Sequence, residues 1–238
     1  MEQTHKTYQP DDRMITLIND NFQLLQVMSR FGIKVGFGDL TVREVCVENG
    51  VDCHTFLTVV NCVNQGFSPA GMRGTVSLPA LVDYLRRSHH YFLDYFLPAI
   101  RRKLTDGIEQ RTSDVSFLIL KFFDEYTAEV RQHMNYEEQM LFGYIDSLTR
   151  DGVAAPPQGM RTYSDHHEEV SERLGELKNI ILKYCPVNAD VDLLNDALYD
   201  IYRSEVELES HCRLEDTLLV PAIMNLERLK RTSIREEA

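Results

Sequence analysis

Two similar stretches of the chain decide its fold: HMNYEEQML at residues 133–141 and HCRLEDTLL at residues 211–219. Each begins with a histidine, carries a glutamate four residues later, continues with a second acidic residue and ends in two apolar residues. Residues four positions apart lie on one face of an α-helix, one turn apart. The pattern therefore predicts two helices that each present an imidazole and a carboxylate together. These residues are His133, Glu137, His211 and Glu215.

A pair of adjacent histidines precedes each stretch, His89-His90 before the first and His166-His167 before the second. The first stretch begins 43 residues after His90, and the second begins 44 residues after His167. Isolated His-x-x-x-Glu pairs arise readily by chance. Two pairs at matching distances from a double histidine indicate instead that the two halves of the chain repeat one functional unit.

This repeat predicts a two-metal site inside a four-helix bundle, where facing helices bring such groups together in the core. Each metal would take two imidazole nitrogens, while Glu137 and Glu215 would bridge the two metals at a separation of about 3.5–4 Å. Imidazole and carboxylate ligands without thiolate suit iron, manganese or zinc. Bridged metals with redox chemistry favour iron, so we expect two iron ions joined by the carboxylates and by an oxo or hydroxo group.

The sequence leaves two alternatives for the ligand on the first helix. Local periodicity favours His89, because it continues the apolar stripe of Leu85, Phe92 and Phe96. The repeat favours His90, because its distance to the following stretch matches that of the second half. We therefore predict six metal ligands: His90, His133, Glu137, His167, His211 and Glu215.

Two further carboxylates, Glu129 and Glu207, each lie four residues before the histidine of a His-x-x-x-Glu pair. They could accept hydrogen bonds from the ligand imidazoles and so fix the ring tautomers, or they could relay protons. An ordinary solvated helix face is an equally weighted alternative for both residues.

The composition is that of an acidic, helix-forming chain. Its 238 residues include only 12 glycines and 8 prolines, which favours helix. A formal net charge of −12 argues against attraction to nucleic acid or to anionic membranes. Five cysteines without a CxxC motif predict reduced thiols rather than a disulfide framework or zinc site. With no signal-peptide pattern and no long apolar run, we expect a soluble, cytoplasmic protein.

We predict an all-α fold with two domains. Residues 1–72 would form a small helical domain, with one helix over residues 13–31, whose apolar stripe includes Phe22. Two short helices would follow within residues 41–63, the first opened by the capping-box pattern Thr41-x-x-Glu44 and the second capped by Asp52. Residues 73–238 would form an antiparallel four-helix bundle, because four long amphipathic segments are joined by short connections. These segments span residues 77–104, 113–148, 162–184 and 189–230.

Residues around the repeat extend the pattern to Leu97-Pro98-x-Ile100, Glu138-x-x-Leu141-Phe142 and Val220-Pro221. The whole pattern is similar to the hemerythrin-like HHE domain, and more closely resembles the "repair of iron centres" proteins, over about residues 77–225. In that family the matching histidine of the first helix stands eight residues before the proline, which again selects His90.

The resemblance implies a di-iron centre with open coordination positions and a role in nitrosative or oxidative stress, through repair of iron–sulfur clusters. The partners implied are O2, NO or peroxide, and damaged iron–sulfur proteins. Four histidines, rather than the five of oxygen-carrying hemerythrin, favour reactivity over simple O2 storage. Whether the chain is an enzyme stays open at this point.

One stretch departs from the family, whose N-terminal domain carries a Cys-Cys-Gly-Gly loop. Residues 34–39 read KVGFGD here and contain no cysteine. The departure supports an alternative function, an O2, NO or redox sensor or oxygen-binding module that signals through the N-terminal domain. A DNA-binding helix-turn-helix over residues 41–62 is disfavoured, because Arg43 is the only arginine or lysine in it.

Overall fold

The computed structural model describes residues 6–67, 76–108, 114–151, 165–185 and 189–236. Within these ranges the regular structure is helical, with no strand, so the predicted all-α fold is confirmed. Contacts divide the chain into two compact units, residues 1–88 with 213–238, and residues 89–212. The predicted domain boundary between residues 72 and 73 lies outside the described residues.

Helices of the first unit begin with α1 (Met14–Asp20), α2 (Leu24–Arg30), α3 (Val42–Glu48) and α4 (Cys53–Asn64). The predicted capping box is present, since Thr41 accepts a hydrogen bond from the backbone of Glu44 and the Glu44 side chain bonds back to Thr41. Asp52 caps α4 as expected, with its carboxylate 2.7 Å from the backbone nitrogen of Thr55. These caps satisfy backbone groups that would otherwise lack partners.

The single helix predicted over residues 13–31 is wrong, because the structure divides it between α1 and α2. Asn21 ends the first helix, and its side-chain oxygen accepts a hydrogen bond from the backbone of Gln23 at 3.1 Å. Such local side-chain bonds compete with helical hydrogen bonds. The break exposes Phe22, which the continuous apolar stripe had placed inside.

Long helices dominate the rest of the chain, and three of them contain a π-helical turn. They are α5 (Leu78–His90), η2 (Tyr91–Phe96) and α6 (Leu97–Gly107); α7 (Asp114–Tyr136), η3 (Glu137–Phe142) and α8 (Gly143–Asp151); α9 (Asp165–Tyr184); and α10 (Val191–Leu214), η4 (Glu215–Leu219) and α11 (Val220–Glu236).

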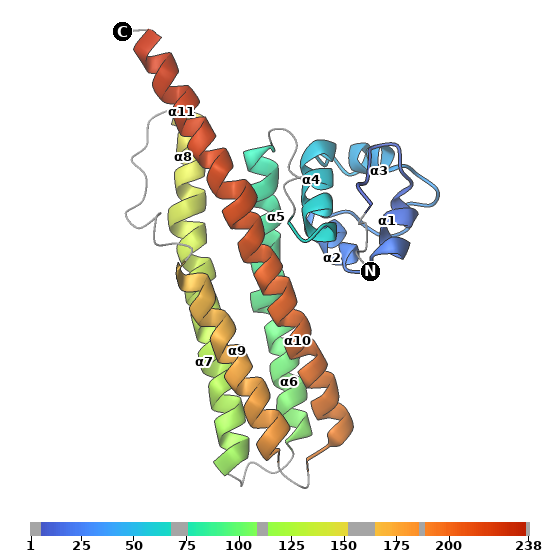
Figure 1. Cartoon of the computed structure of the whole chain (residues 1–238), viewed down its shortest axis with the longest axis vertical. Coiled ribbons are helices and arrows are strands. Elements are labelled where there is room, and N and C mark those ends of the chain that lie inside the picture. The colour runs from blue at the N-terminus through green and yellow to red at the C-terminus, as the bar shows by residue number, and fades with distance from the viewer. Residues whose placement is uncertain (1–5, 68–75, 109–113, 152–164, 186–188, 237–238) are drawn as a thin grey trace. The chain divides into compact units, whose positions relative to one another are not determined.

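The second unit is a four-helix bundle of η2–α6, α7, α9 and α10, which run alongside one another in Figure 1. Helix α7 packs against α6 and α9. Lys103 of α6 pairs with Asp200 of α10 at 2.6 Å, and Lys178 of α9 pairs with Glu205 of α10 at 2.5 Å. These contacts close the ring of helices around one core.

That core is apolar and continuous along the bundle. It includes Phe92, Phe96, Ile100, Phe123, Tyr126, Val130, Leu174, Leu177, Ile181, Ala197 and Ile201. Each large apolar side chain contributes about 1.5–3 kcal/mol when it is fully buried. The same core surrounds the few buried polar side chains of this unit and shields them from solvent.

Candidate metal centre

Three ligand-type side chains from three different helices meet inside the second unit. His89, Glu137 and His211 each offer a ring nitrogen or carboxylate oxygen, and these atoms lie within 4.8 Å of one another. Nε2 of His89 lies 3.0 Å from Oε2 of Glu137 and 3.3 Å from Nε2 of His211. All three side chains are at most 2 % exposed. We call them, together with His133, the inner cluster.

His133 joins the inner cluster through the other oxygen of the same carboxylate, since its Nε2 lies 2.8 Å from Oε1 of Glu137. The predicted helical His-x-x-x-Glu geometry is therefore present here. Glu137 is completely buried and has one histidine at each oxygen. A carboxylate in this position can bridge two cations, one at each oxygen.

The charges of the inner cluster depend on one another. Burial acts to raise the pKa of Glu137, but hydrogen bonds and positive charge from His133 and His89 outweigh it and hold this pKa well below its usual range. Burial acts to lower the pKa of His89, yet hydrogen bonds to Glu137 and Glu138 more than offset it and raise this pKa. Glu137 and His89 therefore stabilise each other's charged forms.

Packing and an outer hydrogen bond fix the ring of His89. It stacks on Phe142, with ring centroids 5.5 Å apart and planes inclined by 15°. Its Nδ1 lies 3.0 Å from Oε1 of Glu138. Because a carboxylate only accepts, Nδ1 is the donor, and Nε2 is the nitrogen directed at the inner cluster. Such carboxylate–histidine pairs orient metal ligands in many proteins.

Sequence reasoning missed the role of Glu138, although it quoted the residue as part of the repeat. The sequence does hold a signal for this role, which is the position of Glu138 next to Glu137. Once His89 is taken as the inner histidine, its two ring nitrogens can contact these two adjacent carboxylates. It also missed Cys212, whose buried sulfur lies within 4.8 Å of a ring nitrogen of His133.

The structure places the predicted ligand His90 outside the inner cluster. Its side chain is 80 % exposed, and its Nδ1 lies 2.7 Å from Oδ2 of Asp94. His89 occupies the inner position instead, as the local periodicity indicated. The π-helical turn η2, which begins at Tyr91, adds a residue between this position and Pro98. Counting back eight residues from the proline therefore selects His90 and not the buried His89.

The structure describes the side chains of Glu215, Glu129 and Glu207, and only the backbone of His167. Glu215 is completely buried, one turn beyond His211 on the helical stretch that continues into η4. The backbone of His167 lies in the first turn of α9, and its side chain is outside the described residues. Glu129 pairs with Arg173 at 2.9 Å, and Glu207 pairs with Arg203 at 3.3 Å.

All three π-helical turns lie beside predicted ligands. Turn η2 begins directly after His90, η3 begins at Glu137, and η4 begins at Glu215. Single π-helical turns occur mostly at functional sites, because the extra residue redirects side chains without ending the helix. Their coincidence with the histidines and glutamates supports a functional role for this level of the bundle.

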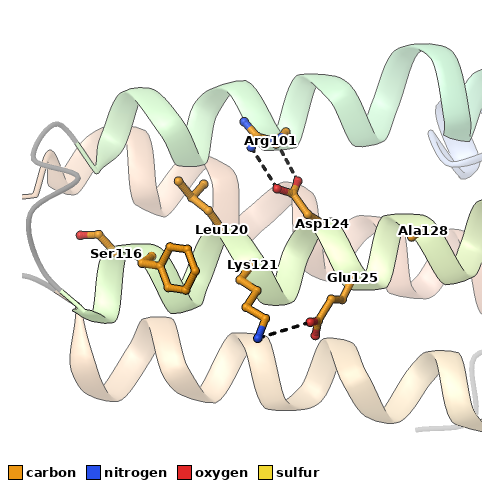
Figure 2. Close-up of a pocket in the computed structure, with 8 residues that line it drawn as sticks. Arg101, Ser116, Leu120, Lys121, Asp124, Glu125 and Ala128 are labelled. Atoms are coloured by element: carbon orange, nitrogen blue, oxygen red, sulfur yellow. Dashed lines mark hydrogen bonds and ion pairs between the residues drawn. The ribbon is translucent and has the colours of Figure 1, made fainter.

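The bundle also has a surface pocket of about 560 Å³, between α6 and α7 (Figure 2). Its charged side chains pair with one another: Arg101 forms a two-pronged ion pair with Asp124 at 2.7 and 3.0 Å, and Lys121 lies 3.7 Å from Glu125. None of the residues that line it belongs to the inner cluster, so we do not regard it as part of the candidate centre.

The donor set of the inner cluster fits a borderline transition metal. Imidazole nitrogens and a carboxylate suit iron, manganese or zinc, and a magnesium or calcium site would require more oxygen donors. The donors come from rigid helices and stand in an apolar core, which favours a fixed coordination geometry.

Comparison with protein families matches residues 80–223 to the hemerythrin HHE cation-binding domain. The chain belongs to this family. A comparison with curated proteins gives no match. The HHE domain and the histidine–glutamate cluster together indicate a metal-binding protein, with iron as the metal that they suggest. No helix in the described part of the chain has both the length and the apolar character needed to cross a membrane.

Proposed function

We propose that this HHE protein holds two iron ions and acts in the cytoplasmic response to nitrosative or oxidative stress. The observation that carries the proposal is Glu137, a fully buried carboxylate with a different histidine at each oxygen. A lone buried carboxylate is costly, whereas one that bridges two cations is well compensated. The proposed ligands are His89, His133, Glu137, His167, His211 and Glu215, with His89 replacing the His90 of the sequence-based set.

Symmetry of the repeat supports Glu215 and His167 as the remaining two ligands. Glu215 corresponds to Glu137, stands one turn from His211 and is equally buried. His167 corresponds to the histidine pair of the first helix. The second half would then supply the same imidazole and carboxylate donors as the first.

The protein's own residues would orient the centre and exclude water from it. Phe142 stacks on His89, and Phe92 lies against His211 with ring centroids 6.2 Å apart. Glu138 accepts the Nδ1 proton of His89, so Nε2 is the nitrogen that would hold iron. A di-iron centre held by these residues would supply redox chemistry toward O2, NO or peroxide.

The first test asks whether the di-iron centre exists. The chain is purified without oxygen and loaded with ferrous iron, and its metal content and absorption spectrum are measured. Two irons per chain and an oxo-bridge band after oxidation would support the centre, whereas no bound transition metal would overturn it. Added NO or peroxide should then release iron to a chelator if the protein donates it.

A further inference from the structure

A row of aromatic rings leads from the inner cluster to the surface of the second unit. The ring of Phe92 meets that of His211 at a steep angle, with centroids 6.2 Å apart. Tyr91 follows at 5.8 Å from Phe92, and Tyr95 lies 5.7 Å from Tyr91. These spacings are those of direct aromatic contacts, about 4.5–7 Å. Tyr95 is 67 % exposed, so the row ends in solvent. We call Phe92, Tyr91 and Tyr95 the aromatic row.

The π-helical turn η2 brings these rings together. Its hydrogen bonds join residues five apart, so side chains four and five positions apart share one side of the helix. Tyr91 accordingly contacts both Tyr95 and Phe96, whose ring centroid is 5.3 Å away. Phe96 in turn lies 6.4 Å from Phe92. The row therefore has two connections between Phe92 and Tyr91, one direct and one through Phe96.

Arg203 of α10 fixes Tyr91 in the middle of the row. Its Nη2 atom donates a hydrogen bond to the phenolic oxygen of Tyr91 at 3.3 Å, and its guanidinium lies 4.3 Å from the ring centre of Phe96. Asp200 and Glu207 hold the same guanidinium at 3.6 and 3.3 Å. Because the Tyr91 oxygen accepts from Arg203, the phenolic proton of Tyr91 is left for another acceptor. Tyr91 is partly exposed, so water can take that proton.

Tyrosine is the side chain of this row that gives up an electron most easily. A phenol can lose an electron together with its O–H proton and form a neutral radical. A phenylalanine ring has no such proton and is far harder to oxidise. Tryptophan, the other readily oxidised aromatic residue, does not occur in the chain. Phe92 would therefore act as a spacer beside His211, while an oxidised state can reside on Tyr91 and Tyr95.

We propose that Tyr91 and Tyr95 carry electrons inward from the surface to the oxidised metal centre, and that a soluble enediol reductant of the ascorbate type supplies them at Tyr95. The inference rests on the proposed di-iron function and adds a second substrate to it. The centre is buried in an apolar core, where a reductant of this size cannot reach it. The exposed ring of Tyr95 gives that reductant a place of contact.

The electrons and protons of this reaction balance. When both irons are ferric, hydrogen peroxide takes two further electrons from the site and two protons from solution, and becomes two waters. Tyr95 then loses one electron inward along the row and its phenolic proton to water. The reductant returns one electron and one proton to Tyr95. Two such transfers convert ascorbate to dehydroascorbate and leave the protein unchanged.

The test uses the full chain, loaded with iron, oxidised in air and freed of unbound metal, with its iron content measured first. Hydrogen peroxide is added without reductant, and samples are frozen for electron paramagnetic resonance. We expect a neutral tyrosyl radical and, at longer times, dityrosine that joins Tyr95 of one chain to Tyr95 of another, mapped by mass spectrometry. Ascorbate added beforehand should suppress both products. The zinc-loaded chain should form neither.

Variants separate the two tyrosines. Tyr95→Phe should lose most of the dityrosine, and its radical should outlast that of the wild type when ascorbate is present. Tyr91→Phe should lose most of both products, because it interrupts the row. Tyr199→Phe is the matched control, since Tyr199 lies on α10 with a ring that is 63 % exposed, and it should behave as the wild type. Circular dichroism and iron content check that each variant is folded and loaded.

The outcomes for the wild type alone decide between the inference and the function on which it rests. An iron-loaded chain that consumes peroxide without forming a tyrosyl radical would overturn the aromatic row as an electron path and leave the proposed function standing. Oxidation at Tyr199 to the same extent as at Tyr95 would do the same. A chain that bound no iron would overturn the proposed function and this inference together.

Discussion

The inner cluster and the outer surface of the bundle both pair positive with negative groups, but burial separates their roles. Glu137 and His89 are at most 1 % exposed and hold each other in an apolar core. His90 and Asp94 form a shorter contact, at 2.7 Å, but the side chain of His90 is 80 % exposed. Contact distance alone therefore does not identify a functional histidine–carboxylate pair, whereas contact inside a dry core does.

The largest expected effect comes from Glu137→Ala, which leaves His89 and His133 without their shared partner. We expect the loss of more than half of the bound iron. We also expect the metal-free chain to lose about 3 kcal/mol of stability, because removing one member of a buried pair leaves the other uncompensated. Metal analysis and denaturant unfolding measure the two effects. Iron content equal to that of the wild type would contradict the bridging role.

The adjacent histidines give the sharpest form of the comparison. His89→Ala should weaken iron binding by more than the 10–100-fold that is typical for loss of an outer partner, because it removes a donor atom itself. His90→Ala, its matched control one residue away, should bind iron as the wild type does. Iron titration with a competing chelator measures both affinities, and a reversed order would restore His90 as the ligand.

Glu138→Ala should lower iron affinity by about 10–100-fold, because it releases the Nδ1 side of His89. Glu138→Gln keeps an oxygen that can accept the bond and should recover part of the loss. A change in the absorption bands of the loaded protein would show that the ring has moved. Equal affinity in all three proteins would mean that the contact at 3.0 Å does not orient the ligand.

The free energy of unfolding should depend on pH in opposite directions in the metal-free and iron-loaded proteins. Near neutral pH, it should fall as pH rises in the metal-free protein and rise in the loaded one. The raised pKa of His89 means that its contribution in the metal-free chain is complete below about pH 6.5 and is lost as pH rises through the folded-state value. The lowered pKa of Glu137 adds stability above about pH 4.5, lost as pH falls through its folded-state value.

Iron competes with the proton for the imidazole, so the loaded chain should instead gain stability as pH rises from about 6 toward 7.5. Thermal unfolding at several pH values, with and without iron, measures both trends. His89→Ala should flatten the decline of the metal-free chain above about pH 6.5. The same slope with and without iron would argue against metal binding at these histidines.

The smallest effect is expected at the surface. Asp124→Ala breaks the two-pronged pair with Arg101, shown in Figure 2, and should cost about 0.2–1 kcal/mol, as exposed pairs do. Because both side chains are nearly half exposed, added salt should shrink the difference further. Iron binding should not change, and a large loss of iron here would contradict the separation between surface and cluster.

The sequence alone was enough to predict the bundle and the pairing of His133 with Glu137, because both follow from the fixed period of the α-helix. It selected His90, whereas the structure places His89 in the inner cluster, since a π-helical turn changes the spacing to Pro98 without leaving a signature in composition. Glu138 was missed for the same reason, because its partner is His89.

The N-terminal unit shows a different limit. Its caps at Thr41 and Asp52 follow from short-range patterns and were predicted correctly. The break at Asn21 arises from one side-chain hydrogen bond within an apolar stripe that otherwise resembles a continuous helix.

The π-helical turns also limit which insertions and deletions the protein can tolerate. A π-helical turn winds more loosely than an α-helix and takes up one extra residue. Deleting Gln139 from η3 would restore ordinary α-helical winding, and the helix beyond it would keep nearly the same facing. The buried side chains of Phe142 and Ile145 would then stay in the core. The same deletion in the middle of α7, which holds no extra residue, would turn everything beyond it by about 100° around the helix axis.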